Sequence, residues 1–163
     1  MSEPAPFTLR EPVVGDLGWI ISRQARLYAD EYGWDARFEG LLAEITGRFV
    51  AGFKPGRERC WVAERDGAVV GAVFLVCKDE QTAQLRMLYV ERSARGLGLG
   101  RTLVDECLRF ARQAGYRRMM LWTNDILVSA RRIYVAAGFE LVEEERHHSF
   151  GHDLVGQVWA REL

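Results

Sequence analysis

The stretch Leu85–Leu103, which reads LRMLYVERSARGLGLGRTL, is the part of the sequence that decides the fold. An apolar run that can form a strand ends near Val90, and glycines at 96, 98 and 100 then precede a helix that we expect to begin at about Gly98. Glycines at alternate positions let the backbone turn with positive φ and let a ligand approach its N–H groups closely. The helix adds unpaired first-turn N–H groups and the positive end of its dipole. The sequence therefore predicts an anion site, most naturally one for phosphate, flanked by Arg95 and Arg101.

Two other kinds of phosphate loop do not fit this segment. A dinucleotide fingerprint requires G-x-G-x-x-G, and counting from Gly96 and Gly98 places Arg101 where the third glycine belongs. That fingerprint also follows the first strand of a parallel sheet, whereas this loop lies past the middle of the chain. A P-loop ends in Gly-Lys-Ser/Thr, and here Gly100 precedes Arg101-Thr102. A nicotinamide-dependent enzyme and a P-loop enzyme are both disfavoured.

Length and composition predict one soluble domain. The chain has 163 residues, of which 48% are hydrophobic and 28% charged, and its net charge is −1. This charge argues against nucleic acid as a partner, and no apolar run is long enough for a membrane span. Residues 1–6 are expected to form a flexible tail without the features of a signal peptide, and residues 7–163 a single domain. Three well-separated cysteines indicate reduced thiols and a cytoplasmic setting.

Periodicity and turn residues predict the order of the elements. Asp16 and Asp35 are expected to cap two helices, and Asp66-Gly67 should form the turn of a hairpin. Within the strand that ends at Val90, the alternation of apolar and polar residues is lost after Met87, which fits either a fully buried strand end or a β-bulge. The expected elements are an edge strand at 7–14, helices at 16–33 and 35–49, strands at 60–65, 68–77 and 82–90, a helix at 98–115, a strand at 117–122, a helix at 126–137, and two closing strands at 139–146 and 154–161 joined through residues 147–153.

Three motifs resemble the GCN5-related N-acetyltransferase (GNAT) family. Leu88-Tyr89-Val90 is similar to the family's strand beside the pantetheine arm, Arg95–Gly100 to its pyrophosphate loop, and Ala130–Phe139 to its A-x-x-x-Y-x-x-x-G-F helix end. More narrowly, the chain resembles the acetyltransferase portion of bacterial MarR-type regulator fusion proteins. The resemblance implies a mixed α+β fold, with a twisted, mostly antiparallel sheet of about seven strands that is splayed between the fourth and fifth strands and flanked by about four helices.

The resemblance also implies a chemistry, namely transfer of the acetyl group of acetyl-CoA to an amine of a small molecule or protein by direct attack in a ternary complex. The Val90 N–H would bind the acetyl carbonyl, and Tyr134 would protonate the CoA thiolate. No metal is implied. A catalytically silent acyl-CoA sensor is the alternative. The implied cofactor-binding residues are Leu88, Tyr89, Val90, Arg95, Gly96, Leu97, Gly98, Leu99, Gly100, Arg101, Asn124 and Tyr134; Asn124 is included because this chain has Leu127 where the family often has asparagine.

The acceptor side is less defined by the sequence. An acceptor amine must arrive neutral, and candidate bases are Glu31, Glu91 and three histidines of the closing segment. A homodimer is a further option that the family allows. Aromatic residues of the first two helices could line the acceptor site, although such a stripe is more often core, and a polar hairpin is the commoner reading of the histidines. The substrate-binding candidates are Tyr28, Tyr32, Trp34, His147, His148 and His152.

Overall fold

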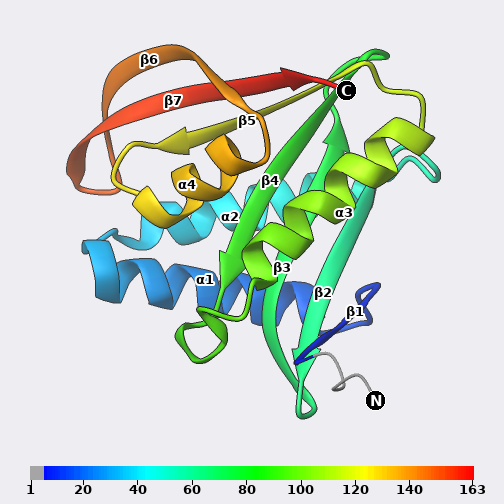
Figure 1. Ribbon diagram of the computed structural model, residues 1–163. Helices are drawn as coiled ribbons and strands as arrows, with labels where there is room; N and C mark the ends of the chain where they lie inside the picture. The colour runs from blue at the N-terminus through cyan, green and yellow to red at the C-terminus, as the bar shows by residue number, and fades with distance from the viewer. Residues whose placement is uncertain (1–5) are drawn as a thin grey trace.

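The computed structural model describes residues 6–163, which form one seven-stranded mixed sheet covered by helices on both faces (Figure 1). The strand order is β1-β2-β3-β4-β5-β7-β6. This architecture confirms the predicted fold class. The elements are β1 (Thr8–Arg10), α1 (Asp16–Tyr32), α2 (Ala36–Ala51), β2 (Arg59–Arg65), β3 (Ala68–Cys77), β4 (Thr82–Val90), a short 3-10 helix η1 (Arg92–Ala94), α3 (Leu99–Gln113), β5 (Arg118–Asn124), α4 (Val128–Ala136), β6 (Glu140–Ser149) and β7 (His152–Glu162).

The core has two layers, one on each face of the sheet. Side chains of α1 and α2 pack on one face against Val62 and Phe74, while α3 and α4 pack on the other face against Val73 and Leu85. Strand β3 is buried on both faces because it lies in the centre of the sheet, as its unbroken apolar run predicts. The turn between β2 and β3 is Asp66-Gly67, with φ of 52° and 77°, as expected for a two-residue hairpin.

Strands β4 and β5 separate along their length. They pair in parallel from Thr82 and Arg118 to Leu85 and Leu121, and no pairing continues beyond these residues. All other neighbouring strands are antiparallel. Figure 1 shows β4 and β5 diverging, with α4 beside the opening. The predicted splay is therefore confirmed, and it leaves one edge of β4 free of a strand partner.

A β-bulge lies just where β4 leaves β5. Phe74 of β3 faces Arg86, but Ala72 faces Tyr89, so two residues of β4 stand opposite Val73. Met87, one of these two residues, has a φ of 55°, in the left-handed region. Since cross-strand partners share a face, Arg86 lies on the α1–α2 side together with Phe74. The bulge interpretation of the lost alternation is confirmed.

Two predictions near the N-terminus differ in outcome. Asp35 caps α2, because its Oδ1 accepts the Arg37 N–H at 3.0 Å. The predicted cap at Asp16 is wrong, since Gly15 in the left-handed conformation is the N-cap of α1. Asp16 is the first helical residue, and its carboxylate accepts the Val13 N–H at 2.7 Å and binds Arg10 at 2.6 Å. These contacts turn the chain, so the first strand ends at Arg10 instead of continuing to residue 14.

The closing hairpin is also longer than the sequence predicts. Its turn consists only of Phe150 and Gly151, with φ of 57° and 86°, so His147, His148 and His152 lie on strands and not in a connecting loop. The predicted tail, residues 1–6, falls almost entirely outside the described residues. Within residues 6–163, no helix has the length and apolar character needed to cross a membrane.

Candidate functional site

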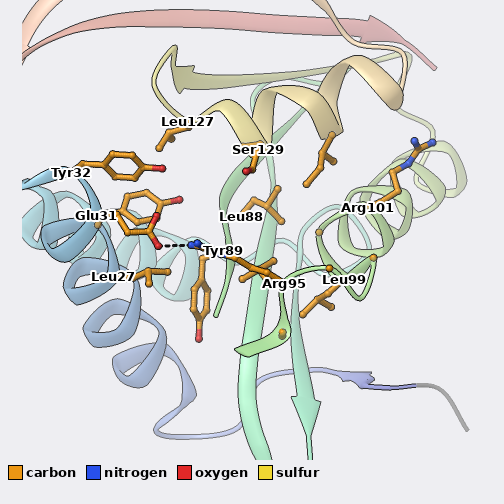
Figure 2. A pocket seen from close by; sticks show the side chains of 18 residues that line it. Leu27, Glu31, Tyr32, Leu88, Tyr89, Arg95, Leu99, Arg101, Leu127 and Ser129 are labelled. Atoms are coloured by element: carbon orange, nitrogen blue, oxygen red, sulfur yellow. Dashed lines mark hydrogen bonds and ion pairs between the residues drawn. The ribbon is translucent and has the colours of Figure 1, made fainter. Parts of the chain in front are cut away.

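A cavity of about 330 Å³ lies at the open edge of β4, bounded by α1, the glycine loop and α4 (Figure 2). We call it the loop cavity. Its floor is formed by Leu88, Tyr89 and Val90, which lie on the part of β4 that no longer pairs with β5. Its other lining residues are Leu27, Tyr28, Glu31 and Tyr32 of α1, Ala94, Arg95, Gly96, Gly98, Leu99, Gly100 and Arg101 of the loop and α3, and Leu127, Ser129, Ala130 and Ile133 at α4.

The loop glycines serve two different purposes. Gly96 and Gly98 have φ of 81° and 77°, and a methyl group added to either would meet no atom within 4 Å. Their role is the left-handed turn, which leaves the main chain open to the cavity. Gly100 has no positive φ; a methyl group there would lie 2.6 Å from Ile133 Cδ1. Gly100 therefore lets α3 pack closely against Ile133 of α4, which corrects the expectation that all three glycines serve the turn.

The main chain of this loop offers unused hydrogen-bond donors. The first intrahelical bond of α3 runs from the Thr102 N–H to the Gly98 carbonyl at 3.0 Å. The N–H groups of Leu99, Gly100 and Arg101 consequently have no partner within the helix, and the helix dipole adds partial positive charge at the same point. This arrangement is suited to an anion such as a phosphate group.

Two arginines flank the loop, and both are held by carboxylates. Arg95 Nη2 lies 2.6 Å from Glu31 Oε1, and Arg92 Nε lies 3.1 Å from the same oxygen (Figure 2 draws the first contact). Burial acts to raise the pKa of Glu31, but the hydrogen bonds from Arg95 and Arg92 outweigh it and lower that pKa. Arg101 is paired with Asp105, one turn along α3, at 2.9 Å. The ion pair between Glu31 and Arg95 joins α1 to the loop across the cavity.

A second, smaller cavity of about 110 Å³ lies between β4, β5 and the two N-terminal helices. We call it the aromatic cavity. It shares Tyr28, Leu88, Leu127 and Ala130 with the loop cavity, so the two meet at the splay. Its remaining lining consists of Gln24, Trp34, Phe38, Leu41, Leu42 and Ile45 from α1, α2 and their connection, Gln84, Leu85, Arg86 and Met87 from β4, Trp122, Thr123 and Asn124 from β5, Tyr134 from α4, and Phe150 from the closing turn.

Tyr134 lines the aromatic cavity and is not among the residues that line the loop cavity. Its side chain is 4% exposed, and its ring packs against Phe139 with centroids 5.9 Å apart. Its hydroxyl makes no hydrogen bond to another side chain or carbonyl in residues 6–163. Burial raises the pKa of Tyr134 well above its ordinary value, so the phenol stays protonated at any physiological pH.

The orientation of the Val90 N–H follows from the strand pattern. The Glu91 N–H donates to the Val70 carbonyl at 2.8 Å, on the β3 side. Successive N–H groups of a strand point to opposite sides, so the Val90 N–H points to the side where β5 has diverged. The splay thus leaves a main-chain donor directed into the loop cavity.

The structure places the other predicted site residues in varied surroundings. Tyr28 lines both cavities, Tyr32 lines only the loop cavity and Trp34 lines only the aromatic one. The side chain of Leu97 packs into the core beside α3 and does not line the loop cavity. Asn124 does not line the loop cavity either; its Oδ1 accepts from His147 Nε2 at 2.8 Å. Asn124 lines the aromatic cavity instead, and its role as a replacement for the family asparagine stays a prediction.

The histidines and Glu91 form contacts of their own. None of the three histidines lines either cavity: His148 binds Asp153 at 2.9 Å, and His152 Nε2 lies 3.0 Å from the Gly33 carbonyl. The closing hairpin thus directs these side chains to contacts outside the two cavities, and their assignment to an acceptor wall stays a prediction. Glu91 is bound by Arg23 at 2.8 Å. No group of three or more potential metal ligands gathers within residues 6–163.

The polar residues of the aromatic cavity that the sequence does not single out include Gln24 and Arg86. Gln24 carries no signal of its own in the sequence. Arg86 carried a visible signal, because it interrupts the apolar run of β4 one residue before the bulge. The sequence could not show that the bulge places Arg86 inside a cavity.

Comparisons with known proteins agree with this geometry. The profile of the "Acetyltransferase (GNAT) family" matches residues 19–139. Human N-acetyltransferase 8B is 38% identical over 106 residues, which cover 62% of this chain and 43% of that protein. An uncharacterised N-acetyltransferase of Schizosaccharomyces pombe is 29% identical over 122 residues, covering 74% and 75% of the two chains. The chain thus spans less than half the length of the human relative.

Solved structures with the same architecture include two bacterial proteins. A GNAT-family acetyltransferase of Staphylococcus aureus Mu50 superposes with a TM-score of 0.78 at 20% identity, over 96% of this chain and 99% of that one. A Salmonella typhimurium protein solved with its cofactor acetyl-CoA gives a TM-score of 0.72 at 21% identity, over 96% and 94%. At these identities the structures show a common fold. With the profile match over most of its length, the chain belongs to the acetyltransferase (GNAT) family.

Proposed function

We propose that this protein is an acetyl-CoA-dependent N-acetyltransferase that acts by direct attack of an amine on the thioester in a ternary complex. The observation that carries the proposal is the meeting of two cavities at the β4–β5 splay. One has a helix N-terminus open to phosphate, and the other can admit a second substrate. Family membership supports the same chemistry.

The loop cavity fits coenzyme A from its phosphates to its thioester. The diphosphate would lie on the free N–H groups of Leu99, Gly100 and Arg101, where the open glycine turns leave room for it. The pantetheine arm would follow the free edge of β4, whose unpaired main-chain groups can bond its amides as a further strand would. This path leads to the Val90 N–H, which would donate a hydrogen bond to the acetyl carbonyl oxygen.

The reaction then needs three groups in place. The lone pair of a neutral amine attacks the carbonyl carbon, the carbonyl electrons move to oxygen, and the Val90 N–H stabilises that oxyanion. As the C–S bond breaks, the sulfur takes the Tyr134 proton, and Tyr134 regains a proton from the attacking nitrogen or solvent. The raised pKa of Tyr134 keeps the phenol protonated before the reaction, and the proton released by the attacking nitrogen restores it after transfer to sulfur.

No residue lining the aromatic cavity is a carboxylate or histidine, so the structure favours no general base there. Glu31 borders the loop cavity but is paired with Arg95 and Arg92, and Glu91 is paired with Arg23. We therefore propose that the amine arrives already neutral and loses its proton to solvent after attack. For an alkylamine with a pKa of about 10.4, the neutral fraction of the amine, and with it the rate, should then rise with pH.

Titration calorimetry and a thiol-release assay test the proposal together. We expect CoA binding that is lost in a Gly98→Val variant, and release of free thiol when acetyl-CoA is mixed with a panel of amines. Absence of CoA binding contradicts the proposal. Tight CoA binding without thiol release from any amine would instead support the silent acyl-CoA sensor.

Several finer predictions from the sequence remain proposals. A bacterial origin and kinship with regulator-fused acetyltransferases are supported only by the resemblance of the helix and hairpin segments. The free thiols of Cys60, Cys77 and Cys107 support a reducing, cytoplasmic setting. The names of similar proteins, an N-acetylaspartate synthetase and a ribosomal-protein-alanine N-acetyltransferase, point to different acceptors and so do not identify this one. The homodimer can be checked by light scattering.

A further inference from the structure

The aromatic cavity contains one charged side chain among the residues that line it, the guanidinium of Arg86. Arg86 is partly buried beneath α2 and makes no ion pair or side-chain hydrogen bond to any residue between 6 and 163. The carboxylate of Glu44 on α2 is bound to Arg48 at 2.6 Å instead. Burial, and then the charge of Arg48, lower the pKa of Arg86, and the carboxylate of Glu44 offsets only part of this effect.

Two further polar groups of the same cavity are unpartnered. Trp34 is 4% exposed, and no atom of residues 6–163 accepts its Nε1–H. Gln24 is 3% exposed, and within the described part of the chain no group donates to its side-chain oxygen. Buried polar groups normally have partners, and the exceptions often mark the place of a ligand. Here a cation, an N–H donor and an oxygen acceptor all border one narrow space that has aromatic walls.

We infer that the acceptor is an elongated primary amine that carries an anionic group, bound by Arg86, at the end of the molecule remote from its nitrogen. The inference rests on the proposed acetyltransferase function and specifies its substrate class. Trp34 provides a second donor for the anion or a polar group near it. The rings of Tyr28, Trp34 and Phe38, with centroids 4.8 to 5.4 Å apart, form an apolar wall for the body of the acceptor.

The strand geometry sets the separation between amine and anion. Arg86 and Val90 lie four positions apart on β4, which at ~3.3 Å per residue, less the shortening at the bulge, is about 10–13 Å. The amine must reach the carbonyl held at Val90 while the anion reaches Arg86. The carboxylate of an α-amino acid is only two bonds from its nitrogen, so we expect a main-chain separation of this size to disfavour it. An ω-amino acid, or an amine that ends in a phosphate, can span this separation.

A steady-state comparison of matched amines tests the inference. The probes are 6-aminohexanoate, 6-aminohexyl phosphate, n-hexylamine and glycine, with acetyl-CoA saturating. We expect kcat/KM for the two anionic six-carbon amines to exceed that for n-hexylamine by about tenfold or more, as for a charge-assisted hydrogen bond, and glycine to be poor. The ratio of kcat/KM for 6-aminohexanoate to kcat/KM for 6-aminohexyl phosphate shows which anion the cavity prefers.

Variants assign the preference to Arg86. The Arg86→Gln variant should reduce the ratio of anionic to neutral amine to within about twofold, and Arg86→Lys should keep part of it because the charge remains without the planar fork. Arg112→Gln is the matched control. It removes the same charge from the exposed side of α3, on the opposite face of the sheet, and should keep the wild-type ratio. Melting temperatures verify that each variant is folded.

Each outcome either supports or overturns the inferred binding of an anionic acceptor by Arg86. A wild-type enzyme that acetylates neutral and anionic amines equally, or an Arg86→Gln variant that keeps the preference, overturns the inference and leaves the acetyltransferase proposal intact. If CoA binds but no amine is acetylated, the proposed function fails, and calorimetry with 6-acetamidohexanoate against N-hexylacetamide in the presence of CoA replaces the assay. Tighter binding of the anionic compound, lost in Arg86→Gln, then supports an anion-binding cavity, and equal or absent binding refutes it.

Discussion

The two cavities that meet at the β4–β5 splay differ in the chemical groups that line them. The loop cavity presents main-chain N–H groups and glycines, with ion-paired arginines at its edge. The aromatic cavity presents side chains from both N-terminal helices, two strands, α4 and the closing turn, and among them one arginine without an ion-pair partner in the described residues. A site made of main chain suits a ligand shared by a whole family, whereas a site made of side chains can change its ligand by single substitutions. The variants and conditions below should affect one cavity and spare the other.

The largest effect should come from pH. Because no carboxylate or histidine lines the aromatic cavity, kcat/KM for an alkylamine with a pKa of about 10.4 should rise nearly tenfold per pH unit between pH 6.5 and 9, following the neutral fraction of the amine. Tyr134 should not oppose this rise, because its raised pKa keeps it protonated throughout. A plateau below pH 8 would reveal a base that the structure does not show, and CoA binding should stay flat over the same range.

Tyr134→Phe should lower kcat by about 100-fold, since removal of a general acid typically has an effect of this size. The dissociation constant of CoA should change little, because Tyr134 does not line the loop cavity. Stopped-flow thiol release and calorimetry measure the two quantities. Tyr116→Phe is the control: it removes a hydroxyl that donates to the Arg57 carbonyl, remote from both cavities, and should leave kcat unchanged. Equal rates for wild type and Tyr134→Phe would remove Tyr134 from the mechanism.

Gly98→Ala should weaken CoA binding by about tenfold, because a side chain at a φ of 77° costs roughly 1–2 kcal/mol and displaces the loop. The KM for the amine should be nearly unaffected at saturating acetyl-CoA. Gly47→Ala adds the same methyl group within α2, where no atom lies within 4 Å, and should leave CoA binding unchanged. If Gly98→Ala binds CoA as tightly as the wild type, the diphosphate does not lie at this loop.

Glu31→Gln should have the smallest effect, a two- to fivefold tightening of CoA binding at low salt. The substitution frees the charge of Arg95 for phosphate, and exposed ion pairs are worth only about 1 kcal/mol or less. The tightening of CoA binding should decrease in 0.5 M salt, because salt screens the attraction between Arg95 and phosphate. Glu39→Gln, an exposed position on α2, should bind CoA as the wild type does. Weaker binding in Glu31→Gln would mean that Glu31 orients Arg95 and does not compete for it.

The difference between the cavities also explains what could be predicted from sequence. Gly96 and Gly98 act through local backbone geometry, so their role was visible in a short segment, as were the Asp66-Gly67 turn and the Asp35 cap. The cap at Asp16 failed because Arg10 and the Val13 N–H engage its carboxylate.

Long-range assembly accounts for the remaining errors. Whether His147 or Arg86 reaches a cavity depends on how β4, β5 and the closing hairpin are placed in the sheet. His147 bonds Asn124 and Ser149 because β6 runs two strands away from the splay edge, while Arg86 enters a cavity because of a one-residue bulge. Neither result is encoded by local spacing, so the acceptor side was the least predictable part of the molecule.

The short ladder between β4 and β5 has a mechanical consequence. Residues from Thr82 to Leu85 are the only part of β4 that bonds to β5, so the two halves of the sheet are joined there as by a hinge. The pantetheine arm of bound acetyl-CoA, hydrogen-bonded to the free edge of β4, would add a further link between the two halves of the sheet. Hydrogen exchange should show it: the Leu88 and Val90 amides should exchange quickly alone and slowly with CoA, while the central amides of β3 stay protected throughout.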